Sequence, residues 1–336
     1  MYSKTYTNID FNNKTVLITG GAGFIGSNLA FYFQNNFPNC EVIIFDSFQN
    51  EEKFSNGNKK SYGHFFNLLG FKGKIICGNI NSKQSLAYLD KYSFDYIFHH
   101  AAISDTRVYD QEAVFETNIN SFYYFINLAL KNSSYLVYAS SAALYGSLES
   151  PQKIGKEKPE NPYAYSKYSM DQIAEDFSRK FPDLNIVGLR FFNVYGAREF
   201  FKEKTSSMVI QLAHQILNNK KPRLFFGSEK IYRDFIYIED VIQANIRACS
   251  AKKNGVYNIG TGIPRSFKDI ADILLKELNS DLSIEFFENP YIDYQTHTRA
   301  DISLSEKYLG FNPNFSLEEG INDYLPEIIN YHKLCL

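Results

Sequence analysis

A glycine-rich turn near the start of the chain constrains the fold more than any other stretch. The apolar run "TVLIT" at 15–19 is followed directly by "GGAGFIG", in which Gly20, Gly23 and Gly26 recur at every third position. Glycines allow the backbone to turn tightly and to approach a pyrophosphate, whose charge then meets the free amides and the dipole of the following helix. The pattern predicts a strand, a phosphate-binding turn and a helix over about 23–33.

Short β-branched runs alternate with longer helical patterns along the first half of the chain. Further strands are predicted at 41–45, 74–77, 96–99, 135–140 and 185–190. Helices are predicted over about 114–130, 163–177 and 206–219, and a short strand at 222–226. Parallel strands need crossover connections, which place helices on both faces of the sheet. We therefore expect an α/β fold with a Rossmann-type, doubly wound parallel sheet.

A chain of 336 residues is long enough for two lobes at roughly 150 residues per domain. We find no flexible linker, so a smaller α/β substrate-binding domain should be interleaved with the first. The dinucleotide-binding domain is expected to comprise 1–192 with returning segments at about 233–262 and 298–315. The substrate-binding domain is expected to comprise 193–232, 263–297 and the C-terminal tail.

The charge balance favours a small-molecule partner. Lys and Arg number 35 against 37 Asp and Glu, so a net charge of -2 provides no general attraction for nucleic acid or for a membrane surface. No apolar run approaches the roughly 20 residues of a membrane span, and the polar start lacks the order of a signal peptide, which favours a cytoplasmic location. The four cysteines are too scattered for a metal site or a redox pair.

Asp46 ends the second predicted strand at the position where dinucleotide folds place an acidic residue. Such a residue bonds the ribose hydroxyls of NAD and repels the additional phosphate of NADP. Lys53 could fold back and pair with a 2′-phosphate, while Glu51 and Glu52 beside it argue for NAD, and a solvated lysine is the ordinary alternative. The residues alone leave both cofactors open.

The stretch "YAYSK" at 163–167 offers two tyrosines before one lysine. On a helix Tyr163 and Lys167 share a face, whereas Tyr165 points elsewhere. A nearby ammonium favours phenolate, so Lys167 is expected to lower the pKa of Tyr163 and to let it exchange a proton with a substrate hydroxyl during hydride transfer. A tyrosine four residues before a lysine is common by chance. The glycine turn and the strands that precede this pair favour a catalytic role for it.

Two further groups follow predicted strands. Ser140 and Ser141 end the fifth strand at the sheet's carboxyl edge, where either could bond the same substrate oxygen or only cap the strand. His99 and His100 are neighbours in a strand and face opposite ways, which disfavours joint metal ligation. No metal is expected.

The motifs "GGAGFIG", "HHAAISD", "YASSAALYG", "YAYSK" and "RFFNVYG", in this order, resemble the extended short-chain dehydrogenase/reductase superfamily. Within it, "NVYGAREFFKEKTSSM", "LFFGSEKIYRDFIYIEDV" and "YNIGTG" resemble the ADP-glyceromanno-heptose 6-epimerase family, and the likeness runs from Lys14 to about Tyr324. It implies that ADP-D-glycero- and ADP-L-glycero-manno-heptose are interconverted by transient oxidation at C6, with bound NADP taking and returning the hydride. It also implies a homo-oligomer, often a pentamer.

The resemblance assigns roles residue by residue. It implies that Tyr163 and Lys202 are the two acid/base groups, that Lys167 supports Tyr163, and that Ser141 polarises the sugar oxygen. This sequence has Lys204 where the family commonly has a small hydroxyl residue. This second lysine is therefore an alternative to Lys202 for the role of second base. The implied cofactor contacts are Gly20, Gly23, Phe24, Ile25, Gly26, Asp46, Ser47, Lys53, His100, Ala101, Ala102, Ile103, Ser104, Asn118, Lys167, Val194 and Lys202. The implied substrate contacts are Ser141, Asn193, Lys204, Gln211 in place of a frequent histidine, Phe225, Phe226, Gly227, Ser228, Arg233 and Tyr294.

Three alternatives were compared with this interpretation. A UDP-sugar 4-epimerase would use the same tyrosine and lysine, whereas a 4,6-dehydratase is expected to carry an acidic pair that "SSAALYG" lacks. A non-catalytic dinucleotide-binding regulator is expected to have lost Tyr163 or Lys167. Two stretches, residues 1–13 and 50–73, depart from the family's pattern. They are expected to be either surface loops or subunit contacts.

Overall fold

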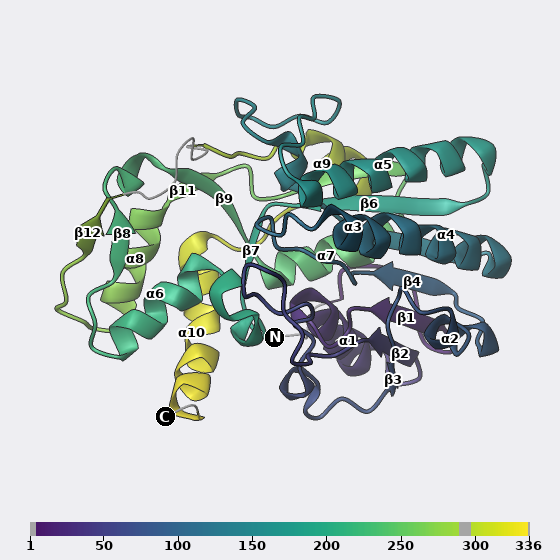
Figure 1. The fold of residues 1–336 in the computed structure, drawn as a ribbon, viewed down its shortest axis with the longest axis horizontal. Helices are drawn as coiled ribbons and strands as arrows, with labels where there is room; N and C mark the ends of the chain where they lie inside the picture. The colour runs from purple at the N-terminus through teal and green to yellow at the C-terminus, as the bar shows by residue number, and fades with distance from the viewer. Residues whose placement is uncertain (1–4, 289–296, 335–336) are drawn as a thin grey trace.

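The computed structural model describes residues 5–288 and 297–334, and its main feature is a parallel sheet of seven strands (Figure 1). The strand order is β10-β6-β5-β4-β1-β2-β3. The strands are β1 (Thr15–Thr19), β2 (Glu41–Asp46), β3 (Lys74–Cys77), β4 (Tyr96–His99), β5 (Tyr135–Ser141), β6 (Asn185–Phe191) and β10 (Gly255–Ile259). The expected Rossmann-type α/β fold is confirmed, and the first six predicted strands all belong to this sheet.

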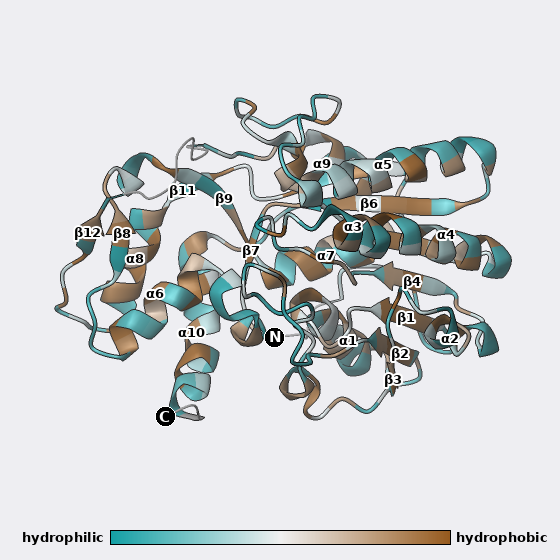
Figure 2. Cartoon of the chain, in the orientation of Figure 1, coloured by the Kyte–Doolittle hydropathy of each residue, from teal (hydrophilic) through white to brown (hydrophobic). Residues whose placement is uncertain are grey.

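Helices cover both faces of the large sheet because its strands are apolar on both faces. In β1, Ile18 belongs to the core layer that contains Leu29, while the adjacent Leu17 belongs to the layer that contains Phe125 and Met170. Figure 2 shows hydrophobic residues concentrated in these strands. The helices of the first layer are α1 (Phe24–Asn36) and α7 (Ile238–Ala248), and those of the second are α4 (Ser121–Asn132) and α5 (Pro162–Lys180).

Local sequence explains where the helices begin and break. Asn161 caps α5 by accepting a hydrogen bond from the Ala164 amide at 2.9 Å, and Pro162 occupies the first turn. The predicted helix over 114–130 differs from the structure. It is divided into α3 (Gln111–Phe115) and α4, which flank a π-helical turn at Glu116–Asn120.

A smaller group of elements lies to one side of the large sheet (Figure 1). Strands β7 (Asn193–Tyr195), β9 (Tyr232–Tyr237) and β11 (Pro264–Ser266) form a three-stranded sheet, and β8 (Arg223–Phe225) pairs with β12 (Glu285–Phe287). Helices α6 (Met208–Leu217), α8 (Phe267–Glu277) and α10 (Leu317–Leu334) pack together beside them. The short helices α2 (Lys83–Leu86) and α9 (Ser303–Leu309) complete the fold. Within the described ranges, no helix has the length and apolar character needed to cross a membrane.

A buried ion network joins α5 to β5 and β6. The guanidinium of Arg190, 2% exposed, donates through Nε to Asp171 at 2.9 Å and through Nη1 to Glu157 at 2.6 Å and to the Tyr145 hydroxyl at 3.0 Å. Asp171 also accepts a hydrogen bond from the Ser140 hydroxyl at 3.0 Å. Burial raises the pKa of Asp171, while Arg190 lowers it. The network therefore fixes the carboxyl end of β5 against α5.

Replacing Arg190 with Met should cost about 3–5 kcal/mol of unfolding free energy, because Asp171 and Glu157 would lose the cation that compensates their burial. Urea denaturation measures the loss. The control is Arg179→Met, which removes a 67% exposed side chain paired with Glu175 and should cost less than about 1 kcal/mol. Equal losses for the two variants would contradict a structural role for the buried network.

Candidate active site

The glycine turn joins the carboxyl end of β1 to the start of α1. Gly20 has a φ of +67°, and a Cβ atom there would lie 2.8 Å from the Ala101 backbone nitrogen. A Cβ on Gly26 would collide with the carbonyl oxygen of Gly20. Gly23 begins α1 without a side-chain cap, so the first amides of the helix are available to an anion. The space and the amides fit the pyrophosphate of a dinucleotide.

Asp46 fastens this turn to the end of β2. Its Oδ2 accepts a hydrogen bond from the Ala22 amide at 2.9 Å, and its Oδ1 accepts one from the Phe48 amide at 2.8 Å. Burial raises the pKa of Asp46, and the two amides lower it. Ser47 follows at the surface, and the exposed Lys53 pairs through its backbone with Lys59.

The segment after β4 lies beside the glycine turn and is held by Asn118. The Asn118 side chain accepts from the Ile103 amide and donates to the Ile103 carbonyl, both at 2.9 Å, and it donates to the Ser166 hydroxyl at 2.9 Å. Both amide hydrogens of Asn118 are thus engaged within the protein. Asn118, predicted as a cofactor contact, therefore positions the predicted contacts Ala101 to Ser104 against α5.

His99 and His100 engage different neighbours, as their alternation in β4 predicts. The His99 Nδ1 lies 2.8 Å from the Thr19 hydroxyl, and the His100 Nε2 lies 3.0 Å from Asn245 Oδ1. Burial lowers both pKa values, that of His100 to about 4. The described part of the chain contains no group of three or more His, Cys, Asp and Glu side chains arranged to hold a metal ion.

Helix α5 places Tyr163 and Lys167 together at the carboxyl edge of the sheet. The Lys167 Nζ lies 6.0 Å from the centre of the Tyr163 ring, and Tyr163 is 8% exposed whereas Tyr165 is 49% exposed. Ser141, at the end of β5, hydrogen-bonds Tyr163 and accepts the Ala143 amide at 3.1 Å. The structure therefore brings together Tyr163, Lys167 and Ser141, and it directs Tyr165 away.

The pKa of Tyr163 differs from the sequence-based prediction of a lowered value. Burial raises it, and the hydrogen bond with Ser141 only partly offsets that effect. The Lys167 ammonium donates to the Ala139 carbonyl at 2.7 Å, so its hydrogen bonding stabilises the strand end rather than a phenolate. Burial lowers the pKa of Lys167 to about 8, while nearby Asp171 raises it.

Lys202 and Lys204 lie on the irregular turn Phe200–Thr205 and point to different places. The Lys202 Nζ is 5.4 Å from the centre of the Phe24 ring, at the start of α1. Burial lowers the pKa of Lys202, and buried Glu199 raises it. Lys204 is exposed and lines a pocket. Lys202 therefore faces the glycine turn, and Lys204 faces the predicted substrate region.

That pocket has a volume of about 820 Å³ and lies between α6, β8, β12 and the loop that carries Arg107. Four predicted substrate residues line it: Lys204, Gln211, Phe225 and Ser228. The sequence analysis did not predict the other basic residues of this pocket, which are Arg107, Lys220, Lys221 and Arg223. The basic run "NNKKPR", which leads into the predicted strand at 222–226, could have indicated three of them. Arg223 pairs with Glu285 of the lining and Arg107 pairs with Asp105, so the lysines supply the positive charge that suits a phosphate-bearing ligand.

The other predicted substrate residues that the structure describes do not line this pocket, and Ser141 lies at Tyr163. Arg233 is 7% exposed, and its guanidinium lies 5.7 Å from the ring of Phe267, which lines the pocket. Phe226 is 58% exposed and stacks on Phe286 at 5.9 Å. Asn193 and Val194 are in β7, and Gly227 has a φ of +81°. Tyr294 lies outside the described residues.

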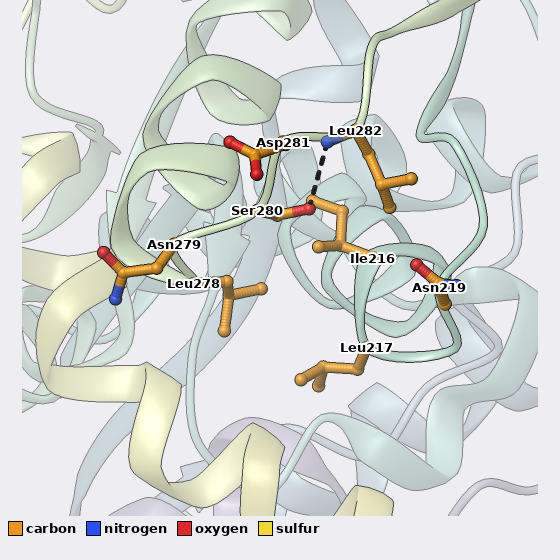
Figure 3. A pocket seen from close by; sticks show the side chains of 8 residues that line it. All are labelled: Ile216, Leu217, Asn219, Leu278, Asn279, Ser280, Asp281 and Leu282. Carbon is orange, nitrogen blue, oxygen red and sulfur yellow. Dashed lines mark hydrogen bonds between the residues drawn. The ribbon is translucent and has the colours of Figure 1, made fainter.

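A second pocket, of about 550 Å³, lies between the end of α6 and the segment after α8 (Figure 3). Its lining consists of Ile216, Leu217, Asn219, Leu278, Asn279, Ser280, Asp281 and Leu282. None of the predicted site residues belongs to it, so we do not assign it to the active site.

These features define a dinucleotide-dependent sugar-nucleotide enzyme, and comparisons with known proteins agree. The model of the NAD dependent epimerase/dehydratase family matches residues 16–260, so the chain belongs to that family, and the prediction of an epimerase-type enzyme is confirmed. An ADP-L-glycero-D-manno-heptose-6-epimerase from Brachyspira hyodysenteriae is 32% identical over 92% of this chain and 96% of that relative.

Solved structures show the same similarity. The Helicobacter pylori ADP-L-glycero-D-manno-heptose-6-epimerase has a TM-score of 0.89 and 45% identity, covering 97% of this chain and 99% of that chain. A UDP-N-acetylglucosamine 4-epimerase from Methanobrevibacter ruminantium has a TM-score of 0.83 and 26% identity, covering 95% of this chain and 99% of that chain. The resemblance to ADP-heptose 6-epimerases that was drawn from the sequence is thereby confirmed.

The lowered pKa of Lys167 predicts a pH-dependent contribution to stability. Between pH 8 and 10.5 the unfolded chain holds more protons at this lysine than the folded chain, so folding becomes more favourable as the pH rises. Relative to Lys167→Met, the wild-type unfolding free energy should increase by up to about 1.4 kcal/mol per pH unit in this window. Urea denaturation at pH 8, 9 and 10 measures it. A difference that does not change with pH would contradict the prediction.

Proposed function

We propose that the protein epimerises C6 of ADP-glycero-manno-heptose, between the D-glycero and L-glycero forms, by transient oxidation to a ketone. The observation that carries the proposal is the placement of Tyr163, Ser141 and Lys167 at the sheet edge beside the glycine turn. The similarity to ADP-heptose 6-epimerases supports the choice of substrate. The basic residues of the 820 Å³ pocket suit the substrate's diphosphate.

Tyr163 is the proton-transfer group on one side of the reacting carbon. With its hydroxyl deprotonated, Tyr163 would accept the proton of the sugar hydroxyl as the carbon is oxidised, and in the reverse direction the phenol so formed would return that proton as the carbon is reduced. Ser141 bonds the same sugar oxygen and polarises it. Lys167 can hold the nicotinamide ribose beside them. A bound nicotinamide cofactor supplies the hydride acceptor that the carbon requires.

Inversion at one carbon requires a second proton-transfer group on the opposite side, because one hydroxyl cannot reach both orientations of the substrate oxygen equally. Lys202 suits this role, because it faces the glycine turn and burial lowers its pKa toward the range useful for acid/base chemistry. Lys204 is exposed on the pocket wall and suits a phosphate contact. We therefore assign the second base to Lys202.

The interleaved division of the chain and its assembly belong to the same proposal. We place cofactor binding in 1–192 with the returning segments 233–262 and 298–315, and substrate binding in the remaining segments. The return of β10 to the large sheet beside β6 supports this division. A homo-oligomer, with a pentamer as the first state to test, follows from the resemblance.

Replacing Tyr163 with Phe should lower the rate of epimerisation about 10²- to 10⁴-fold, because the proton-transfer group is removed while the ring is kept. The matched control is Tyr165→Phe, on the same helix with its side chain 49% exposed, which should retain the wild-type rate. NMR of ADP-heptose follows configuration at C6, and a parallel incubation with UDP-glucose follows C4. Inversion at C4 alone would favour a UDP-sugar 4-epimerase, and full activity of Tyr163→Phe would contradict the assignment.

We propose NADP as the cofactor. The resemblance implies it, and the loop after Asp46 carries Lys53, whose charge could meet a 2′-phosphate, whereas Lys59 and Lys60 in the same loop pair with Glu203 and Glu52. Denaturing the purified protein should therefore release a dinucleotide with the mass of NADP and its ultraviolet spectrum. The Lys53→Ala variant should lose affinity for NADP more than for NAD. Release of NAD, or equal losses for the two cofactors, would overturn this choice.

A further inference from the structure

The turn that carries Lys202 is held by buried Glu199 at its ends, and Phe200 packs against the main core. Buried Glu199 accepts hydrogen bonds from the Gly196 amide at 3.1 Å and from the Ser207 amide at 2.7 Å. Between these anchors, none of the residues Phe200–Thr205 is buried, and Glu203 adopts a φ of +51° that is unfavourable for a residue other than glycine. Contacts between the turn and neighbouring segments therefore help to fix the direction of Lys202.

Aromatic contacts of the two residues that precede Lys202 supply part of that constraint. Phe200 stacks on Tyr331 of α10 with ring centres 5.2 Å apart and planes inclined by 18°. Phe201 stacks on His64 with ring centres 3.6 Å apart and planes inclined by 7°. Both rings contact Tyr331 of α10, and that of Phe201 also stacks on His64, from a different part of the chain.

His64 also contacts the glycine turn. Its backbone amide donates to the Ala22 carbonyl at 3.0 Å, and the Asn67 side chain donates to the same carbonyl at 3.0 Å. The His64 Nδ1 accepts the Phe66 amide at 3.2 Å and begins the short 3-10 helix Phe65–Leu68. A single residue therefore joins the phosphate-binding turn, through its backbone, to the Lys202 turn, through its ring.

Two polar contacts support the same junction. The Lys59 Nζ lies 2.6 Å from Glu203 Oε1, with Lys59 largely shielded and Glu203 half exposed, and the side chains of Tyr62 and Thr205 are hydrogen-bonded. Partly exposed ion pairs contribute little on their own. The close stack of His64 on Phe201 is the contact that sets the geometry.

We propose that His64 is a positioning residue that fixes the Lys202 turn against the glycine turn. The inference rests on the proposed role of Lys202 as second base. It gives a role to the stretch 50–73, which departs from the family's pattern. If the stack is lost, the Lys202 turn keeps its anchors at Glu199 but loses its register with the cofactor site, and small displacements of reacting groups reduce rates strongly.

Two substitutions of His64 separate its ring from its capping nitrogen. His64→Asn keeps an acceptor for the Phe66 amide and removes the ring, whereas His64→Phe keeps a ring that can stack on Phe201 and removes the acceptor. For His64→Asn we expect kcat to fall about tenfold, with KM for ADP-heptose changed less than about twofold. The His64→Phe variant should keep most of the wild-type kcat. The Lys202→Met variant, which removes the proposed base, should show the largest loss of kcat.

Hydrogen exchange tests the contact without reference to activity. The backbone amide of Lys202 donates to the Glu199 carbonyl at 2.9 Å, and that of Ser206 donates to the Glu203 carbonyl at 3.1 Å. These two amides should exchange faster in His64→Asn than in the wild type, and at the wild-type rate in His64→Phe. Unchanged exchange in His64→Asn, an unchanged kcat, or a loss of kcat in His64→Phe equal to that in His64→Asn would overturn the inference. A wild-type protein that does not epimerise ADP-heptose would refute the proposed function, while the exchange rates would still decide whether His64 holds the turn.

Discussion

Close backbone approach at Gly20 is the constraint on which the rest of the site depends. The space of a missing side chain lets β1 turn beside the backbone of Ala101, and it brings the uncapped start of α1 to the carboxyl edge of the sheet. The backbone of Ala22 then becomes a common anchor. Its amide donates to Asp46 at the end of β2, and its carbonyl accepts from His64. One turn thereby sets the positions of the end of β2, the uncapped start of α1 and the contact through His64 to the Lys202 turn.

Burial of charge governs the chemistry behind this edge. Lys167 and the Arg190–Asp171 pair are enclosed between α5 and the strands, where water cannot stabilise their charges. The structure compensates Asp171 with Arg190, whereas Lys167 has a carbonyl as its hydrogen-bond partner and a lowered pKa. A lysine whose pKa burial lowers to about 8 loses its proton more readily than a lysine in water, and this one lies one helical turn from Tyr163.

The sequence predicted those features that depend on local periodicity or on spacing within one element. The first six strands of the large sheet follow from β-branched runs, and the partnership of Tyr163 and Lys167 follows from one turn of helix. Features that depend on contacts between distant segments were not predictable in this way. Local periodicity did not place strand β10, although 233–262 was expected to return to the first domain, and burial reverses the expected direction of the Tyr163 pKa. The role of His64 becomes visible only when its ring is seen on Phe201.

An enzyme that inverts one carbon must hold two proton-transfer groups in a fixed relation, although they come from different segments. Here Tyr163 is rigid because α5 is packed and capped along its length, so its position follows from the fold. Lys202 lies on a turn without buried residues, and its position must be imposed from outside. The contact through His64 imposes it relative to Ala22. Because Ala22 is also bonded to Asp46, the proposed second base and the proposed cofactor site share one reference in the backbone.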